Sequence, residues 1–272
     1  MKPILLTGNA AAAWGARLAR IDYVPAFPIT PQTEIIETLG AWFDSGVMPG
    51  RMVTLESEHS MLTAAGAAAA TGVRVFSATS SQGLLYAMEM LYTVAGWRAP
   101  FVLVNVSRGL SAPITLESDH NDVLAARDSG FLQIHCATCQ EVTDSVLMAY
   151  RIAEHAEVRL PVLVAYDGFF TSHQKRRVQV FDPHDPKVRG FLGEPDNRWA
   201  REDLLRRIRD PFDPALEEVA VALGAMEDLS VVPAMLDARR LATTVEAREA
   251  IDGGATTAII PTGGTEQNGP HM

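Results

Sequence analysis

The chain has 272 residues, 47% of them apolar and 21% charged, which is the ordinary composition of a soluble globular protein. Its formal net charge of −10 argues against binding to a nucleic-acid backbone, which needs clustered lysine and arginine. No apolar run reaches the roughly 18 residues of a membrane-spanning helix, and the N-terminus MKPILLTGNA lacks a signal-peptide pattern. We therefore expect a cytoplasmic protein with one large domain, or one domain and an appendage.

Residues 1 to about 170 alternate between short apolar runs and longer helical patterns. Uninterrupted apolar strands separated by helices predict a doubly wound α/β fold, whose parallel sheet is covered on both faces and binds ligands at the carboxyl ends of its strands. The predicted strands are Pro3–Leu6, Tyr23–Phe27, Met52–Leu55, Val73–Ala78, Phe101–Val106, Leu132–His135 and Pro161–Ala165. The predicted helices are Ala10–Arg20, Gln32–Phe43, His59–Gly72, Gly83–Ala95, Asp122–Arg127 and Gln140–His155.

Hydroxyl residues stand directly before three of these helices, at Thr30-Pro31, at Ser57 and at the Ser80/Ser81 pair. Serine and threonine accept hydrogen bonds from the free amides of a helix start, and proline is favoured at the first helical position. Residue types alone therefore favour capping at all three places.

The alternation stops after about Ser172. Phe181–Arg198 is dense in proline, aspartate and glycine, so we expect an extended segment there. No internal repeat is visible. Beyond this segment the pattern predicts helices and a last strand, at Arg201–Arg209, Pro214–Gly224, Ala234–Ile251 and Ala255–Ile260.

The stretch Leu55–Gly83 carries the clearest sign of chemistry. A strand ends in the acids Glu56 and Glu58, a helix rich in alanine and glycine follows, and a second strand ends in the hydroxyl-rich turn Thr79–Gly83. We expect that helix to pack very closely. A carboxylate at the carboxyl edge of an α/β sheet can meet a buried ligand, although Glu58 also suits the positive end of a helix dipole.

Cys136 and Cys139 form a CxxC pair next to His135. The spacing allows half a zinc site, a redox pair or cluster ligands. A zinc ion or an iron–sulfur cluster needs about four ligands, however, and His135 adds only one. We favour two reduced thiols and predict no metal site. The phosphate-binding motifs GxGxxG and GxxxxGK[ST] and the nucleophile motif GxSxG are absent from the sequence.

Four segments of the chain stand out together. They are FPITPQTE (Phe27–Glu34), LESEHS (Leu55–Ser60), FSATSSQGLLYAMEMLY (Phe76–Tyr92) and SRGLSAPITLESDHNDVLAARDSGF (Ser107–Phe131). In this order they resemble the α subunit, or pyrimidine-binding domain, of the thiamine-diphosphate-dependent 2-oxoacid:ferredoxin oxidoreductases, and LPVLVAYDGFFTSH (Leu160–His173) matches the end of that domain. The resemblance covers about residues 1–180 and implies the doubly wound thiamine-binding fold for them. Residues 181–252 are then a linker and helical extension, and residues 253–272 a tail.

The resemblance implies roles for individual residues. Glu58 matches the glutamate that faces the aminopyrimidine of thiamine diphosphate, where a carboxylate protonates N1′ so that the 4′-amino group can remove the C2 proton. Thr30 and Arg108 match the residues that contact the substrate, and a planar guanidinium suits the carboxylate of a 2-oxoacid. A surface ion pair is the alternative role of Arg108. The implied cofactor-binding residues are Glu58, Pro28, Ile29, Ser81 and Gln82.

The implied reaction is the oxidative decarboxylation of a 2-oxoacid, for example pyruvate, to an acyl-CoA, with electrons passed to ferredoxin. The magnesium and diphosphate half of the site is absent here: Asp167-Gly168 with Asn197 matches its motif faintly, but Tyr166 replaces the first glycine. The resemblance places that half on a partner β subunit. It places the iron–sulfur clusters and CoA on partner subunits, with further γ and δ subunits in the complex. His59, Asp119 and His120 rank behind these residues, as groups that only support the site.

The tail Gly253–Met272 resembles the start of the creatininase-like amidohydrolases. There Glu266 matches a metal-binding glutamate, Asn268 replaces a frequent histidine, and His271 is penultimate. We expect no metal at the tail. The alternatives to an active α subunit are a catalytically silent structural subunit or truncated remnant and, with less support, a metal-dependent amidohydrolase fragment.

Overall fold

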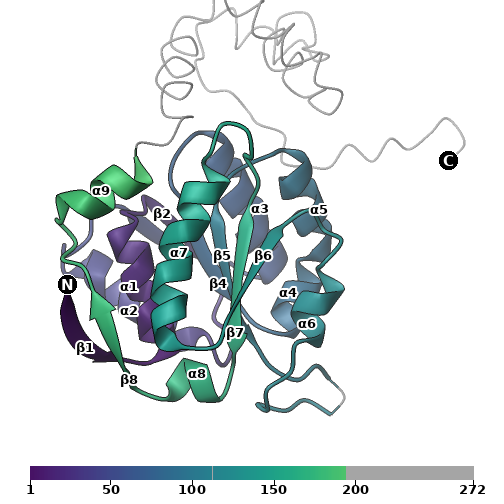
Figure 1. Ribbon diagram of the computed structural model, residues 1–272. Coiled ribbons are helices and arrows are strands. Elements are labelled where there is room, and N and C mark those ends of the chain that lie inside the picture. The colour runs from purple at the N-terminus through teal and green to yellow at the C-terminus, as the bar shows by residue number, and fades with distance from the viewer. Residues whose placement is uncertain (112, 194–272) are drawn as a thin grey trace, which may run out of the picture. The chain divides into compact units, whose positions relative to one another are not determined.

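The structure, a computed structural model, describes residues 1–111 and 113–193. At its centre lies a four-stranded parallel sheet in the order β4-β5-β7-β6 (Figure 1). The strands are β4 (Phe76–Thr79), β5 (Val102–Ser107), β6 (Leu132–Cys136) and β7 (Val162–Asp167). Each was expected from an apolar run, within two or three residues at either end.

Two more parallel strands extend this sheet on the β4 side. β2 (Tyr23–Ala26) pairs with β3 (Arg51–Thr54), and one parallel bridge joins Tyr23 to Val75, next to β4. The chain winds outward from β2 to β3 on one side and from β4 to β5 on the other. The doubly wound fold is thus confirmed, and its direction of winding reverses between β2 and β4, where such sheets bind ligands.

Helices cover both faces of the sheet (Figure 1). Against one face pack α1, α2 and α7, and against the other pack α3 and α5. The helices are α1 (Gly8–Leu18), α2 (Thr33–Asp44), α3 (Glu58–Ala70), α4 (Gln82–Tyr86), α5 (Met88–Gly96), α6 (Asn121–Ala125), α7 (Cys139–Ala153), α8 (Phe170–His173) and α9 (Pro186–Leu192).

Strand β5 divides its side chains between the two cores. Val102, Val104 and Val106 lie in the core under α1 and α7, while Leu103, with Phe101 just before the strand, lies in the core under α3 and α5. Successive side chains of a strand point to opposite faces, so a strand buried on both sides is mostly apolar. This is why the sequence shows uninterrupted apolar runs.

Helix α3 packs as closely as its composition predicted. A Cβ added at Gly66 would lie 2.4 Å from Val94 Cγ2 of α5, and Ala65 and Ala69 are fully buried. Only glycine allows this approach of the two helices. This contact holds α3, whose first residue is Glu58, closely against α5.

The first predicted strand is present, but it does not join the parallel sheet. β1 (Lys2–Leu6) instead pairs antiparallel with β8 (Arg176–Val180), a strand that the sequence pattern did not single out. The expectation of parallel pairing was wrong for β1, because an apolar run predicts a strand and leaves its partner open.

Two local expectations also differ from the structure. The helix expected over Gly83–Ala95 is divided at Ala87 into α4 and α5. The segment expected to be extended contains α9, whose first helical residue is Pro186. The preceding Asp185 caps this helix, because its side chain accepts a hydrogen bond from Lys187 N. The elements expected after residue 193, with the tail, lie outside the described residues. No helix of the described ranges is both long and apolar enough to cross a bilayer.

Candidate functional site

The residues singled out from the sequence follow four neighbouring strands at one edge of the sheet. Thr30 follows β2, Glu58 follows β3, Ser81 with Gln82 follows β4, and Arg108 follows β5. Because the parallel strands end at the same edge, their loops meet where the winding direction reverses. At this edge Arg108 hydrogen-bonds to Thr30, Ser81 and Gln82. Glu58 forms no hydrogen bond with Arg108 and lies against Gly83, the residue after Gln82.

Arg108 is a buried cation, 4% exposed. Its Nε donates to Thr30 O at 2.8 Å, and its Nη1 donates to Ser81 Oγ at 3.2 Å, Gln82 Oε1 at 2.9 Å and Gly109 O at 3.1 Å. All four acceptors are neutral, and within the described ranges no carboxylate pairs with this guanidinium. Burial lowers the pKa of Arg108, and the nearby Asp122 carboxylate opposes that effect. A buried cation without an ionic partner favours binding of an anion.

The backbone of Ser81 has a conformation that is rare for residues other than glycine. Its φ is +47°, in the region that favours glycine. The single O–H of Ser81 is shared between Gln82 Oε1 at 2.8 Å and Gly109 O at 3.0 Å, and the backbone N–H of Ser81 donates to Asp122 Oδ2 at 3.0 Å. Ser81 forms no side-chain cap for α4, so the capping expectation was wrong here.

Glu58 is the first residue of α3 and is only 5% exposed. The preceding Ser57 caps the helix by accepting a hydrogen bond from Ser60 N at 3.1 Å, as predicted. The Glu58 carboxylate accepts no hydrogen bond from any described residue. A Cβ at Gly83 would lie 2.5 Å from both Glu58 Oε1 and Thr79 Oγ1, so the missing side chain of Gly83 makes the space that the carboxylate fills.

The loop after β2 carries Pro28, Ile29 and Thr30 and is tied at both ends. Gln32 Nε2 donates to Phe27 O at 2.9 Å, and Arg108 holds the carbonyl of Thr30. Helix α2 starts only at Thr33 and its first turn has no side-chain cap, so Thr30 does not cap it. The expectation of a cap was wrong because Thr30 and Pro31, joined by a cis peptide bond, both belong to the loop.

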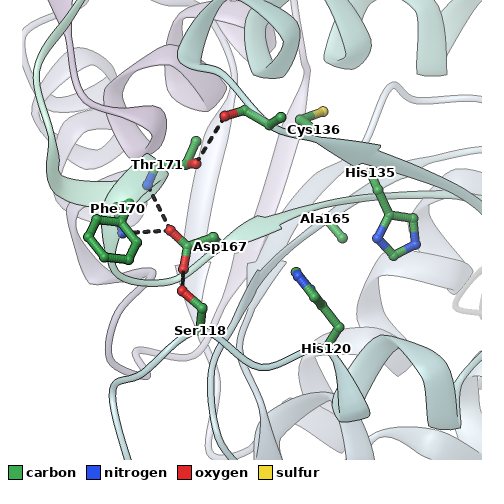
Figure 2. A pocket seen from close by; sticks show the side chains of 9 residues that line it. Ser118, His120, His135, Cys136, Ala165, Asp167, Phe170 and Thr171 are labelled. Atoms are coloured by element: carbon green, nitrogen blue, oxygen red, sulfur yellow. Dashed lines mark hydrogen bonds between the residues drawn. The ribbon is translucent and has the colours of Figure 1, made fainter.

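A separate hollow of about 490 Å³ lies at the carboxyl ends of β6 and β7 (Figure 2). Asp167 ends β7 there and accepts hydrogen bonds from the Ser118 hydroxyl and from the backbone N–H groups of Phe170 and Thr171. His120 and His135 approach edge to face, with ring centroids 6.1 Å apart. Neither Glu58 nor Arg108 lines this hollow, so it is distinct from the predicted site.

Cys136 and Cys139 are free, buried thiols. Burial raises the pKa of Cys136 to about 11 and also raises the pKa of Cys139. A thiol becomes reactive or ligates a metal as the thiolate, which such environments disfavour. Within residues 1–111 and 113–193 no three histidine, cysteine or acidic side chains are grouped so that they could hold a metal ion.

The residues that ranked behind Glu58, Thr30 and Arg108 in the sequence analysis lie outside the hydrogen-bonded group around Arg108. His59 Nε2 lies 3.3 Å from Glu89 Oε2 on the exposed side of α3, and Glu56 is exposed. His120 lines the separate hollow, and Asp119 accepts a hydrogen bond from Asn121 N at 2.7 Å in the same loop.

Two residues that sequence reasoning missed are Asp122 and Gly83. Asp122 is a fully buried acid hydrogen-bonded to Ser81, and Gly83 makes room for Glu58. An acid in the first turn of a predicted helix is usually a cap, and a glycine after a serine pair is usually part of a turn. Neither residue could therefore be recognised from the sequence as part of the site.

Known proteins match this chain over most of its length. Residues 14–229 match the family described as "Pyruvate flavodoxin/ferredoxin oxidoreductase, thiamine diP-bdg". The pyruvate synthase subunit PorA of Methanocaldococcus jannaschii is 44% identical over 201 residues, which covers 73% of this chain and 51% of that relative. The PorA subunit of Thermotoga maritima is 43% identical over 233 residues, 84% of this chain and 59% of that relative. The chain thus spans little more than half the length of these relatives.

A solved structure shares the fold. The 2-oxoglutarate:ferredoxin oxidoreductase from Magnetococcus marinus with 2-oxoglutarate, coenzyme A and succinyl-CoA bound superposes with a TM-score of 0.61 at 24% sequence identity. The match covers 67% of this chain and 32% of that one. It supports the doubly wound architecture independently of the sequence motifs.

Proposed function

This chain belongs to the pyruvate flavodoxin/ferredoxin oxidoreductase family of thiamine-diphosphate-binding proteins, and on that premise we propose that it supplies the pyrimidine side of a thiamine site. The proposed reaction is the oxidative decarboxylation of a 2-oxoacid to an acyl-CoA, with electrons passed to ferredoxin. One observation carries the proposal. A buried carboxylate without a hydrogen bond, on Glu58, and a buried guanidinium without a carboxylate partner, on Arg108, share one edge of the sheet within the described chain.

The surroundings of Glu58 fit the pyrimidine end of thiamine diphosphate. A buried carboxylate that accepts no hydrogen bond from its own chain can share a proton with a ring nitrogen, and the missing side chain of Gly83 lets the Glu58 carboxylate take its position. When bound, thiamine diphosphate supplies the nucleophilic carbon that attacks the 2-oxoacid carbonyl. Glu58 holds the proton at N1′ of the aminopyrimidine, and the rigid start of α3 keeps its carboxyl group in place.

Arg108 and Thr30 form the substrate end of the proposed site. Nε and Nη1 of Arg108 are committed to the neutral acceptors of the loops, which leaves Nη2 to donate to the carboxylate of a 2-oxoacid. Thr30 is exposed and its backbone carbonyl accepts the hydrogen bond from Arg108 Nε, so its side chain is proposed to contact the substrate as well. Burial strengthens this charge-assisted contact by excluding water. Pro28, Ile29, Ser81 and Gln82 are proposed to line the cofactor's side of the same cleft.

We propose that residues 1–180 form the pyrimidine domain and that a partner β subunit holds the diphosphate and its magnesium ion. Iron–sulfur clusters and CoA belong in this proposal to β, γ and δ partners, with ferredoxin as acceptor. Because the matched relatives carry the name pyruvate synthase, pyruvate is the first substrate to test. The two free thiols fit a reducing compartment, and we propose a cytoplasmic location.

The test is Glu58→Gln in the full chain, co-expressed with the partner subunits. The wild-type complex is expected to reduce ferredoxin when pyruvate, CoA and thiamine diphosphate are all present. Glutamine keeps the shape of Glu58 but cannot exchange the proton with N1′, so we expect a loss of about 10²-fold or more in kcat. The matched control is Glu56→Gln, an exposed acid in the same segment, which should leave the rate unchanged.

The outcomes separate the candidate functions. A Glu58→Gln complex that turns over at the wild-type rate contradicts the role of Glu58. A wild-type complex that assembles but never oxidises a 2-oxoacid identifies a silent structural subunit instead.

A further inference from the structure

Asp122 is a buried acid to which the proposed mechanism gives no role. It lies in the first turn of α6 and is fully buried. Its Oδ2 accepts hydrogen bonds from Asn105 Nδ2 at 2.7 Å and from Ser81 N at 3.0 Å, and its Oδ1 accepts from Val123 N at 2.7 Å. Burial raises the pKa of Asp122, while these hydrogen bonds act in the opposite direction. Burying a carboxylate costs free energy, so its position calls for an explanation.

Ser81 connects Asp122 to Arg108. Its backbone N–H donates to the Asp122 carboxylate, and its hydroxyl oxygen accepts from Arg108 Nη1 at 3.2 Å. The φ of +47° allows the N–H of Ser81 to face Asp122 while its hydroxyl faces Arg108. A backbone conformation of this kind persists only where its surroundings enforce it, and the hydrogen bond to Asp122 does so.

Asp122 stabilises the charge of Arg108 without pairing with it. The carboxylate is near enough to oppose the effect of burial on the guanidinium, yet the two side chains form no ion pair in the described structure. A direct ion pair would occupy the donors that an incoming carboxylate needs. Placing Ser81 between them keeps the attraction and leaves those donors available.

We propose that Asp122 is a positioning residue that acts through Ser81: it fixes the guanidinium of Arg108 for the carboxylate of the 2-oxoacid while leaving that guanidinium without an ionic partner of its own. The inference rests on the proposed function, since it names the substrate group that Arg108 receives. It adds to the site a residue that does not touch the substrate itself.

The test compares two inhibitors of pyruvate oxidation by the assembled complex. Oxamate carries the carboxylate that Arg108 would bind, whereas methyl pyruvate is neutral. In the Asp122→Asn complex we expect the inhibition constant of oxamate to rise about tenfold or more. A guanidinium displaced from its position loses that much or more of its affinity for the carboxylate. The inhibition constant of methyl pyruvate should stay within about twofold, and KM for pyruvate should rise more than kcat falls.

Asp128→Asn is the matched control. The side chain of Asp128 is 75% exposed and lies six residues from Asp122, and its change removes the same charge. We expect no change in either inhibition constant. Equal weakening of both inhibitors by Asp122→Asn would reveal a general structural role and overturn the proposal, as would an unchanged response to oxamate.

Ser81→Ala covers the case in which Asp122→Asn does not fold. It removes the hydroxyl that Arg108 contacts but keeps the backbone N–H that donates to Asp122. The same selective loss of oxamate inhibition supports the proposal, and unchanged oxamate inhibition contradicts it. A wild-type complex that oxidises no 2-oxoacid refutes the proposed function itself, which distinguishes that failure from a failure of the positioning role alone.

Discussion

Gly83 controls the space into which the Glu58 carboxylate extends. A methyl group at this position would lie 2.5 Å from Glu58 Oε1, closer than real Cβ contacts allow, so the carboxylate must move. The backbone of Gly83 is helical and tolerates alanine, so the cost falls on the site more than on the fold. The absence of one side chain is therefore part of the proposed cofactor site.

For Gly83→Ala we expect the assembled complex to require about tenfold more thiamine diphosphate for half-maximal activity, because the displaced carboxylate no longer meets the pyrimidine ring. The measurement is a titration of activity against cofactor concentration. Gly96→Ala is the control, since a Cβ there meets nothing within 4 Å. An unchanged cofactor requirement for Gly83→Ala would show that Glu58 does not face the cofactor.

Asp167 joins two elements at the carboxyl edge, the end of β7 and the loop that follows β5 (Figure 2). Burial raises the pKa of Asp167, but hydrogen bonds from Ser118 and from the backbone N–H groups of Thr171, Phe169 and Phe170 outweigh it, and the net pKa is lowered. The ionised form is thus favoured in the folded state. A group of this kind stabilises the fold above its unfolded pKa and loses that contribution as the pH falls through its folded pKa.

Asp167→Asn should therefore destabilise the full chain by about 1 kcal/mol at pH 7, the value of a typical hydrogen bond. The difference from wild type should shrink as the pH falls below about 4, where the wild-type carboxyl group also takes up a proton. Urea unfolding of both proteins at pH 7, 5 and 3.5 measures this difference in the free energy of unfolding. A difference that is constant over this range, or as large for the exposed Asp128→Asn, would contradict the assignment.

The elements of the parallel sheet could be predicted from the sequence because its central strands, β4, β5 and β7, are buried on both faces and are mostly apolar. The pairing of β1 could not, since Pro3–Leu6 is equally compatible with a parallel or an antiparallel neighbour. Helix α9 was missed because Asp185-Pro186, a cap followed by a first-turn proline, lies in a segment whose composition resembles a loop.

The capping expectations show which part of the site could be predicted. Ser57 caps α3, but Thr30 and Ser81 take part in loop contacts to Arg108 instead. Local residue preference fails at these two positions because long-range hydrogen bonds determine them, as is common at functional sites. Glu58, Thr30 and Arg108 could be selected from their motifs, whereas Asp122 and Gly83 become visible only when the strands are assembled.

At the scale of the whole molecule, the proposed site accounts for one end of thiamine diphosphate only. The proposal assigns the pyrimidine ring to Glu58 and its neighbours, and the diphosphate with its magnesium ion to a partner subunit. We expect the full chain alone to lose thiamine diphosphate on desalting and the assembled complex to retain it. Cofactor content after gel filtration, measured by thiochrome fluorescence, tests this. Stoichiometric retention by the chain alone would contradict the shared site.

The antiparallel pair of β1 and β8 has a consequence for the order in which the protein can form. Lys2 pairs with Val180 and Leu6 with Arg176, so β1 is synthesised some 170 residues before its partner strand. β2 and β3, by contrast, are neighbours in the chain and can pair early. Contacts of such long sequence separation slow folding. β1 therefore cannot pair with β8 until nearly all of the parallel sheet has been synthesised.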